Sequence, residues 1–219
     1  MEISIVLPTY NEAENIKELI PQLKKEFPKA EILVVDDSSP DGTAKVAKSL
    51  GVRVIVRKKK EGIGAALAEG YRKAKGGIIM SMDADGSISV ESVRILLKKL
   101  QKYDLVVGSR YSKGGSPSGR KLQKIISALG NKAIKIMCRL PVDDVSLNFK
   151  TFRKESLKFF KFNEKTNVIG IEMILDAKSN KLRIGQMPVI FSERHYGASK
   201  TKLSKLIPLY LSFFMRRIF

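Results

Sequence analysis

The sequence predicts an α/β fold with a mainly parallel central sheet, and two observations support this prediction. First, short apolar runs typical of buried strands alternate in the N-terminal half with segments whose apolar residues recur at helical spacing. Second, the apolar run 78–82 leads directly into Asp83 and Asp85, two carboxylates placed where a buried strand would leave its sheet. The 219 residues, 43% of them hydrophobic, suit a single sizeable core.

The first half is expected to consist of successive βα units. We expect strands over residues 3–7, 31–35, 52–56, 78–82 and 105–107, and helices over 12–27, 44–50, 65–74 and 89–102. The helix over 12–27 carries Ile16, Leu19 and Leu23 on one face, and either Asp41 or Thr43 would cap the helix over 44–50. Such repeated alternation implies a doubly wound sheet with right-handed crossovers.

The second half is less regular. Residues 112–119 are a loop of Gly, Ser and Pro, long enough to form a lid. The helix over 120–140 is amphipathic and basic, and its lysines either meet an anionic partner or simply face solvent. We further expect strands over 148–152 and 186–191, helices over 154–160 and 169–180, and a last segment over 202–219. The apolar stripe of the helix over 120–140 consists of Leu122, Ile125, Ile126, Leu129, Ala133, Ile136 and Met137.

Charge, cysteine content and apolar segment length indicate the kind of partner and the location of the protein. The net charge of +19, from 41 Lys and Arg against 22 Asp and Glu, favours an anionic partner: nucleic acid, an acidic membrane surface or phosphorylated substrates. The single cysteine, Cys138, excludes an internal disulfide framework. No apolar segment reaches the roughly 20 residues that a membrane-spanning helix requires, so we expect a cytoplasmic protein.

Four polar clusters follow predicted strands, at residues 8–12, 36–37, 83–85 and 108–111. The carboxyl ends of parallel strands line one crevice, so these clusters are expected to meet. An aromatic ring and carboxylates suit a base and ribose, and an Asp-x-Asp pair suits Mg²⁺ or Mn²⁺ carrying substrate phosphates. Each cluster also has a purely structural interpretation, in which Pro8 ends a strand, Glu12 favours a helix N-terminus and Asp36 bonds local amides.

Six motifs occur in a fixed order along residues 3 to about 200. They are Pro-Thr-Tyr-Asn-Glu (8–12), Asp-Asp-Ser-Ser-Pro-Asp-Gly-Thr (36–43), Gly-Ile-Gly-Ala-Ala (62–66), Met-Asp-Ala-Asp (82–85), Gly-Ser-Arg-Tyr (108–111) and Arg-x-x-Gly-x-Ser-Lys (194–200). Together they resemble glycosyltransferase family two, most closely its dolichol-phosphate mannose synthase branch. The resemblance implies a GT-A, Rossmann-like nucleotide-sugar-binding fold over residues 1–200. It also implies inverting transfer of a hexose from a nucleotide sugar, typically GDP-mannose, to a polyprenyl (dolichyl) phosphate.

The resemblance also implies roles for individual residues. Those similar to the family's nucleotide-binding set are Pro8, Tyr10, Glu12, Val35 and Asp37. Those similar to its metal and diphosphate set are Asp83, Ala84 and Asp85, with Ser87 at the next metal-side position. The metal would be Mg²⁺ or Mn²⁺. The expected catalytic set is Asp85 with Arg194 and Lys200, the latter two being similar to the cations that hold donor and acceptor phosphates.

Departures from the family pattern lie mainly on the acceptor side. Gln123 stands four residues before Ser127, where the family usually has Arg. The segment resembling Asp-x-Thr-x-Gly-Phe-Arg runs from Asp144 to Lys150, with loss of Gly and exchange of Arg for Lys, which are not equivalent at a bidentate phosphate site. Gly86 replaces the usual Leu. We therefore expect the protein to use a nucleotide-sugar donor, whereas the sequence does not identify the acceptor.

Three functions are compatible with these residues. A phosphate nucleophile is already anionic and needs no general base, which agrees with a sequence whose one histidine, His195, is expected to be a loop residue. A soluble enzyme acting on a glycan hydroxyl would need a carboxylate base, with Asp143 or Asp144 as candidates. The third is a basic protein that binds nucleic acid without catalysis, although no recognised nucleic-acid motif is present, so we expect no such partner.

Residues 201–219 are expected to form a separate C-terminal amphipathic segment. Residues 206–215 are largely apolar and too short to cross a bilayer, and basic residues flank them on both sides. This pattern predicts peripheral attachment to an anionic membrane surface. The alternatives are a terminal helix packed on the core or a truncated anchor, and in each case Pro208 is expected to kink or restart the helix.

Overall fold

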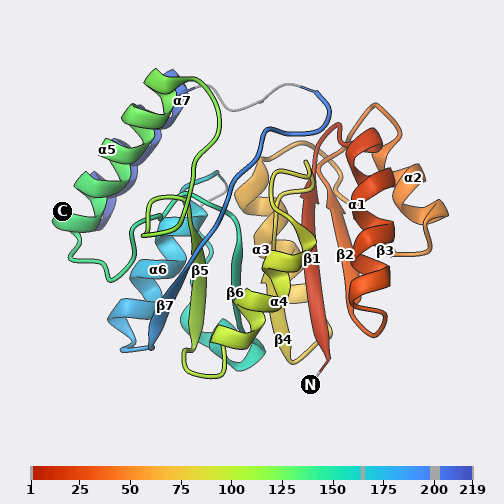
Figure 1. Cartoon of the computed structure of the whole chain (residues 1–219), viewed down its shortest axis with the longest axis horizontal. Coiled ribbons are helices and arrows are strands. Elements are labelled where there is room, and N and C mark those ends of the chain that lie inside the picture. Colours follow the sequence, from red (N-terminus) through yellow and green to blue (C-terminus); the bar gives the residue numbers. More distant parts are fainter. Residues whose placement is uncertain (1, 164–165, 198–202, 219) are drawn as a thin grey trace.

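The computed structural model describes residues 2–163, 166–197 and 203–218. Its centre is a seven-stranded sheet with the order β3-β2-β1-β4-β6-β5-β7 (Figure 1). All neighbouring strands pair in parallel except β6, which runs antiparallel to β4 and β5. The mainly parallel sheet expected from the sequence is therefore confirmed. The strands are β1 (Ile3–Thr9), β2 (Glu31–Asp36), β3 (Arg53–Val56), β4 (Ile78–Ser81), β5 (Leu105–Ser109), β6 (Lys150–Arg153) and β7 (Ile184–Pro188).

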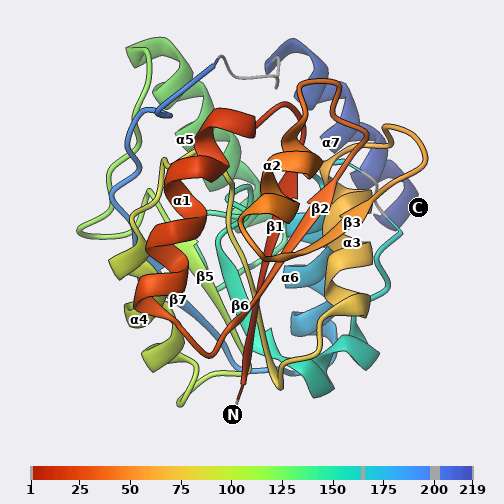
Figure 2. The ribbon, with the colours of Figure 1, turned by 90° about the vertical axis from the view of Figure 1, so that its right-hand side faces the viewer.

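Helices cover both faces of the sheet, and two hydrophobic cores result (Figure 2). Along β1, Val6 points into the core beneath α3 and α6, whereas Ile5 and Leu7 point into the core beneath α1 and α4. This alternation explains why the strands are apolar on both faces. The helices are α1 (Ala13–Glu26), α2 (Thr43–Ser49), α3 (Ile63–Lys73), α4 (Val90–Lys99), α5 (Lys121–Met137), α6 (Ile169–Ser179) and α7 (Leu203–Ile218), with a 3-10 turn η1 (Lys154–Phe159).

Most element boundaries lie within two residues of those expected. Helices α4 and α5 each end three residues earlier than expected, at Lys99 and Met137, and three further differences concern β7, residues 154–159 and α7. Strand β7 begins at Ile184 and ends at Pro188 because its pairing with β5 starts there, so the expected strand over 186–191 was placed too late. Residues 154–159 form a 3-10 turn and not an α-helix. Helix α7 continues through Pro208, so the expected restart does not occur, since a proline near a helix start removes a single hydrogen bond.

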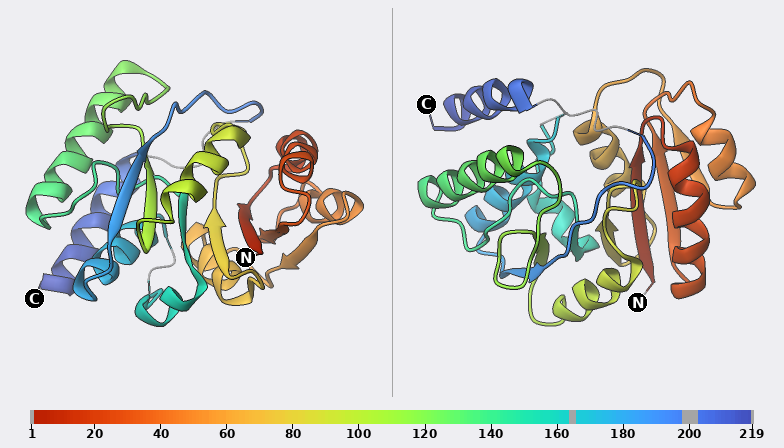
Figure 3. Two further views of the ribbon diagram at one scale, coloured as in Figure 1. Left: turned by 60° about the horizontal axis from the view of Figure 1, so that its bottom comes forward. Right: turned by 45° about the horizontal axis from the view of Figure 1, so that its top comes forward.

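Helix α5 differs from the other helices because its apolar stripe faces solvent. Leu122 is 68% exposed and Leu129 is 62% exposed, and Asn131 is the buried residue of the helix. Helices α5 and α7 lie on the same flank of the molecule, beyond β5 and β7 (Figure 3). Phe213 and Phe214 anchor α7 in the core, while its Leu211 and Met215 are exposed. Among the described residues, none of the helices combines the length and apolarity that a bilayer crossing demands.

Candidate active site

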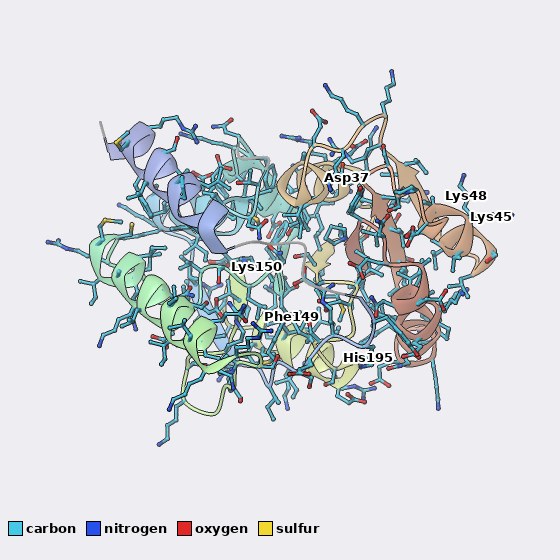
Figure 4. The ribbon with its side chains drawn as sticks, turned by 90° about the horizontal axis from the view of Figure 1, so that it is seen from above. Asp37, Lys45, Lys48, Phe149, Lys150 and His195 are labelled. Atoms are coloured by element: carbon cyan, nitrogen blue, oxygen red, sulfur yellow. The ribbon has the colours of Figure 1, made fainter. Side chains whose placement is uncertain are left out.

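The carboxyl ends of β1, β2 and β4 meet at one edge of the sheet, which Figure 4 shows from above. Pro8 is in register with Val35 of the neighbouring strand, and the Asp37 N–H donates to the Thr9 carbonyl at 2.9 Å. The parallel register thus brings the expected clusters after the first, second and fourth strands to one place. This edge is the candidate active site.

Tyr10 and Asp37, expected to bind the nucleotide, both contact the basic loop that follows β3. Lys60 Nζ lies 3.5 Å from the centroid of the Tyr10 ring, a cation–π contact. The Asp37 carboxylate accepts hydrogen bonds from Arg57 Nη1 at 2.6 Å and from the Gly62 N–H at 2.8 Å. Asp37 therefore fixes this loop. To bond a nucleotide base, the Asp37 carboxylate would have to give up some of these hydrogen bonds to the loop.

Asp83 and Asp85 follow β4 directly, Asp83 half-buried and Asp85 buried. Desolvation by the surrounding protein, followed by the negative charge of Asp85, raises the pKa of Asp83 to about 6. Asn148 Nδ2 donates a hydrogen bond to Asp83 Oδ1 at 3.2 Å and offsets part of that cost. A cation bound here would relieve the repulsion between the two carboxylates.

The oxygen atoms around these acids suit a hard divalent cation. The buried Oδ1 atom of Asn148 has no hydrogen-bond partner within the described ranges, so an amide oxygen is available on the residue that contacts Asp83. Carboxylate and amide oxygens are preferred ligands of Mg²⁺ and Mn²⁺. Across the described part of the chain, no group of three or more His, Cys, Asp or Glu side chains is arranged to hold a metal. A cation held by Asp83 and Asp85 would therefore share its coordination with substrate oxygens.

Arg194 reaches this site from the segment that follows β7. Its Nη2 donates to Asp85 Oδ2 at 3.0 Å, and its Nη1 lies 3.9 Å from Glu12 Oε1. The imidazole of His195 packs on Gly86, where an added Cβ would lie 2.9 Å from the ring. Gly86 has a φ of +74°, a conformation that favours glycine. The glycine at this position thus admits the His195 ring.

Arg110, which follows β5, forms an ion pair with the buried Asp144. Arg110 Nε donates to Asp144 Oδ2 at 2.7 Å, and Nη2 donates to Oδ1 at 3.1 Å. Burial alone would raise the pKa of Asp144, but Arg110 holds it below its ordinary value. Burial lowers the pKa of Lys150 to about 8, and this side chain lies at the centre of the strand edge (Figure 4). Two cationic side chains therefore lie behind this part of the strand edge, Arg110 paired with Asp144 and Lys150 buried with its Nζ on the Leu147 carbonyl.

Residues 4–160 match the family model described as glycosyl transferase family 2. The chain belongs to glycosyl transferase family 2. It is 32% identical over 215 residues to undecaprenyl-phosphate mannosyltransferase of Micrococcus luteus, with 91% of this chain and 87% of the relative covered. It is 30% identical over 216 residues to polyprenol monophosphomannose synthase of Mycolicibacterium smegmatis, with 92% and 82% covered.

Solved structures of other enzymes confirm the GT-A-like fold. Glucosyl-3-phosphoglycerate synthase from Mycobacterium tuberculosis, in complex with Mn²⁺ and uridine-diphosphate-glucose, superposes with a TM-score of 0.72 at 20% identity, covering 94% of this chain and 73% of that one. Mannosyl-3-phosphoglycerate synthase from Rubrobacter xylanophilus gives a TM-score of 0.70 at 19% identity, covering 100% and 74%. At these identities the likeness concerns the fold alone.

In this family 2 glycosyltransferase, the structure brings some of the expected site residues together and leaves the roles of others as predictions. Arg194 lies within ion-pair distance of both Glu12 and Asp85. The Ser87 hydroxyl donates to Asp85 Oδ1 at 2.5 Å, so it orients that carboxylate, and its contact with a metal stays a prediction. Lys200 lies outside the described residues. Three more expected residues are buried at this edge of the sheet, and their contact with a ligand stays a prediction: Pro8, Val35 and Ala84.

Two residues of the site were not expected from the sequence. Asn148 contacts Asp83, and Asn15 donates a hydrogen bond to Glu12 Oε2 at 2.6 Å. The sequence contained a signal for Asn148, since it replaces the glycine of the family segment. Asn15 gave no signal, because an asparagine in the first turn of a helix is ordinary.

Proposed function

We propose that this glycosyltransferase transfers a mannosyl group from GDP-mannose to a polyprenyl phosphate such as dolichyl phosphate, with inversion at the anomeric carbon, at the cytoplasmic face of a membrane. Two relatives whose names specify mannose and a polyprenyl phosphate or polyprenol match more than nine-tenths of this chain and support the proposal. The proposal replaces the non-catalytic nucleic-acid-binding hypothesis, because the family is one of enzymes.

The state of the two candidate bases is the observation that favours a phosphate acceptor. Asp144 is paired with Arg110, and Asp143 is paired with Lys135 and accepts a hydrogen bond from Gln186 Nε2. Burial alone would raise the pKa of Asp143 too, but Lys135 and Gln186 hold it below its ordinary value. Carboxylates stabilised in the charged form are poor acceptors of a hydroxyl proton. An acceptor that arrives as an anion avoids this requirement.

The reaction then consists of one displacement. An oxygen of the acceptor phosphate attacks the anomeric carbon, the bond from that carbon to the donor diphosphate breaks, and a nucleoside diphosphate leaves. A divalent cation at Asp83 and Asp85 would supply positive charge to the leaving diphosphate. Arg194, held between Glu12 and Asp85, adds a second positive charge on the same side. The buried Lys150 and the partly buried Arg110, which is paired with Asp144, place positive charge near Asp83 and favour an anionic acceptor in the other half of the site.

The flank formed by α5 and α7 supports docking on an anionic membrane. The exposed stripe of α5 gives an apolar surface, and Lys121 and Lys132 of the same helix are exposed around it. On α7, Leu211 and Met215 add exposed apolar area, while the opposite face packs on the core. Apolar residues surrounded by lysines suit a headgroup region with anionic lipids.

A donor and acceptor screen tests this function. The purified protein is incubated with Mn²⁺ and radiolabelled GDP-mannose, with a polyprenyl phosphate or a mannoside carrying only hydroxyl groups as acceptor, and UDP-sugars are run in parallel. Label that enters the organic phase only with GDP-mannose and polyprenyl phosphate is the expected result. Transfer to the mannoside and none to the lipid would instead establish the glycan hydroxyl transferase. Flotation with anionic liposomes, weakened by salt, checks the docking surface.

A further inference from the structure

Residues 192–197, here called the strap, cross the candidate site between β7 and the last helix. The Ser192 N–H donates to the Ser87 carbonyl at 2.9 Å, and the His195 N–H donates to the Asp85 carbonyl at 3.1 Å. One side of the strap is thus fastened to the loop that carries the two acids. Arg194, which lies between these two attachments, is directed at Asp85.

The other side of the strap is fastened to α1 by Asn15. The Asn15 side chain is 5% exposed and makes three hydrogen bonds. Its Oδ1 accepts from the Tyr196 N–H at 3.0 Å, and its Nδ2 donates to the Tyr196 carbonyl at 3.2 Å. The same Nδ2 donates to Glu12 Oε2 at 2.6 Å. Asn15 therefore ties the backbone of the strap and the Glu12 carboxylate to one point.

An amide is required at this position. The two Tyr196 bonds need an acceptor and a donor on one side chain, and the Glu12 bond needs the donor as well. A carboxylate of the same shape keeps the acceptor, loses both donor contacts and sets a second negative charge against Glu12. The other contacts of the strap with α1, from His195 Nδ1 and the Tyr196 hydroxyl to Glu18, are made by side chains that are nearly half exposed. Among the described contacts, Asn15 is thus the buried attachment of the strap to α1.

We propose that Asn15 is a positioning residue for the donor diphosphate: by holding Tyr196 and Glu12 together it fixes Arg194 between Glu12 and Asp85. The proposal rests on the function proposed above insofar as the ligand is a nucleotide sugar. Arg194 meets the charge of the leaving group, and Asn15 acts through Arg194 without touching the substrate. A guanidinium on an unfastened strap would lose the orientation that makes its charge effective.

The test compares Asn15→Asp with Gln22→Glu in the full-length protein. Both changes convert an amide to a carboxylate on α1. Gln22 is exposed and lines the same pocket as Ser192 and His195, but it makes no hydrogen bond to the strap within the described residues. The first measurement is amide hydrogen exchange of peptides spanning residues 192–197, without ligand. We expect Asn15→Asp to speed exchange at His195 and Tyr196 at least tenfold and Gln22→Glu to leave it unchanged. Unchanged exchange in Asn15→Asp would refute the attachment, whatever reaction the enzyme catalyses.

The second measurement is the Kd of Mn²⁺-loaded GDP and UDP by titration calorimetry, which needs no acceptor. For the nucleotide that wild type binds more tightly, we expect Asn15→Asp to raise Kd about tenfold. The double variant with Arg194→Ala should bind no more weakly than Arg194→Ala alone, because one residue acts through the other. A Kd of the double variant that equals the product of the two single-variant increases would overturn the proposal. Failure of the wild-type protein to bind GDP and UDP would also overturn it. Failure of lipid transfer with both measurements as expected would overturn the proposed acceptor and leave the role of Asn15 standing.

Discussion

Asp83→Asn in the metal-free protein is expected to increase stability, and more so at high pH. The carboxyl ordinarily has a pKa of 3.8 and has one of about 6 in the folded protein, so folding raises it by about 2 pKa units. At about 1.4 kcal/mol per unit, the charged carboxylate costs about 3 kcal/mol of folding free energy at pH 8. Asp83 keeps partial contact with solvent, so screening makes this an upper bound.

The sign follows from proton binding. Between pH 4 and pH 6 the folded protein holds this proton more tightly than the unfolded chain, so the contribution of Asp83 to stability is present at low pH and is lost as the pH rises through about 6. A neutral amide of the same shape removes the pH dependence. The advantage of Asp83→Asn should therefore grow by about 1.5 kcal/mol between pH 5 and pH 8.

Urea denaturation with EDTA at pH 5 and pH 8 measures this difference. Asp104→Asn is the matched control, because hydrogen bonds from Arg183 lower the pKa of Asp104. That variant should lose stability, by the same amount at both pH values. An advantage of Asp83→Asn that stays constant from pH 5 to pH 8, or a loss at pH 8, would refute the assignment of Asp83 as a strained carboxylate that a cation relieves.

Three other substitutions test separate parts of the molecule. Asp85→Ala should abolish metal-dependent transfer and retain the circular dichroism spectrum, and wild-type turnover would remove Asp85 from the reaction. Gly86→Ala should lower the free energy of unfolding by about 1–2 kcal/mol, because φ is +74°, and an unchanged urea midpoint would contradict this. Leu129→Ser on α5 should weaken binding to anionic liposomes and leave the Tm unchanged, because Leu129 is 62% exposed. A lower Tm would indicate that Leu129 packs in the core.

Most of the fold could be predicted because the parallel strands are buried on both faces and therefore occur in the sequence as apolar runs. The clusters after these strands were predictable for the same reason, since parallel order brings strand ends together. Strand β6 is different: a strand was expected over 148–152 and lies at Lys150–Arg153, but its antiparallel direction could not be predicted because it depends on partners far away in the sequence. The contact of Asn148 with Asp83 depends on that pairing.

The periodicity of α5 was also predictable, and its environment was not. Leu122 and Leu129 lie on one helical face in the sequence and in the structure, but periodicity does not reveal whether protein, lipid or water covers that face. The attachment of Asn15 to Tyr196 joins residues separated by 181 positions, and nothing local in either segment indicates it.

The antiparallel strand β6 also has a consequence for biosynthesis. Strands β4 and β5 are neighbours in the sequence, yet each pairs with β6 and they do not pair with each other in the described sheet. A nascent chain that has emerged only to about residue 149 would therefore present β4 with one open edge and β5 with no partner strand, because β6 and β7 both come later in the sequence. Open strand edges invite pairing with other chains. The two halves of the sheet are joined only when these four residues arrive, so we expect ribosome-bound intermediates shorter than this to be the aggregation-prone stage of synthesis.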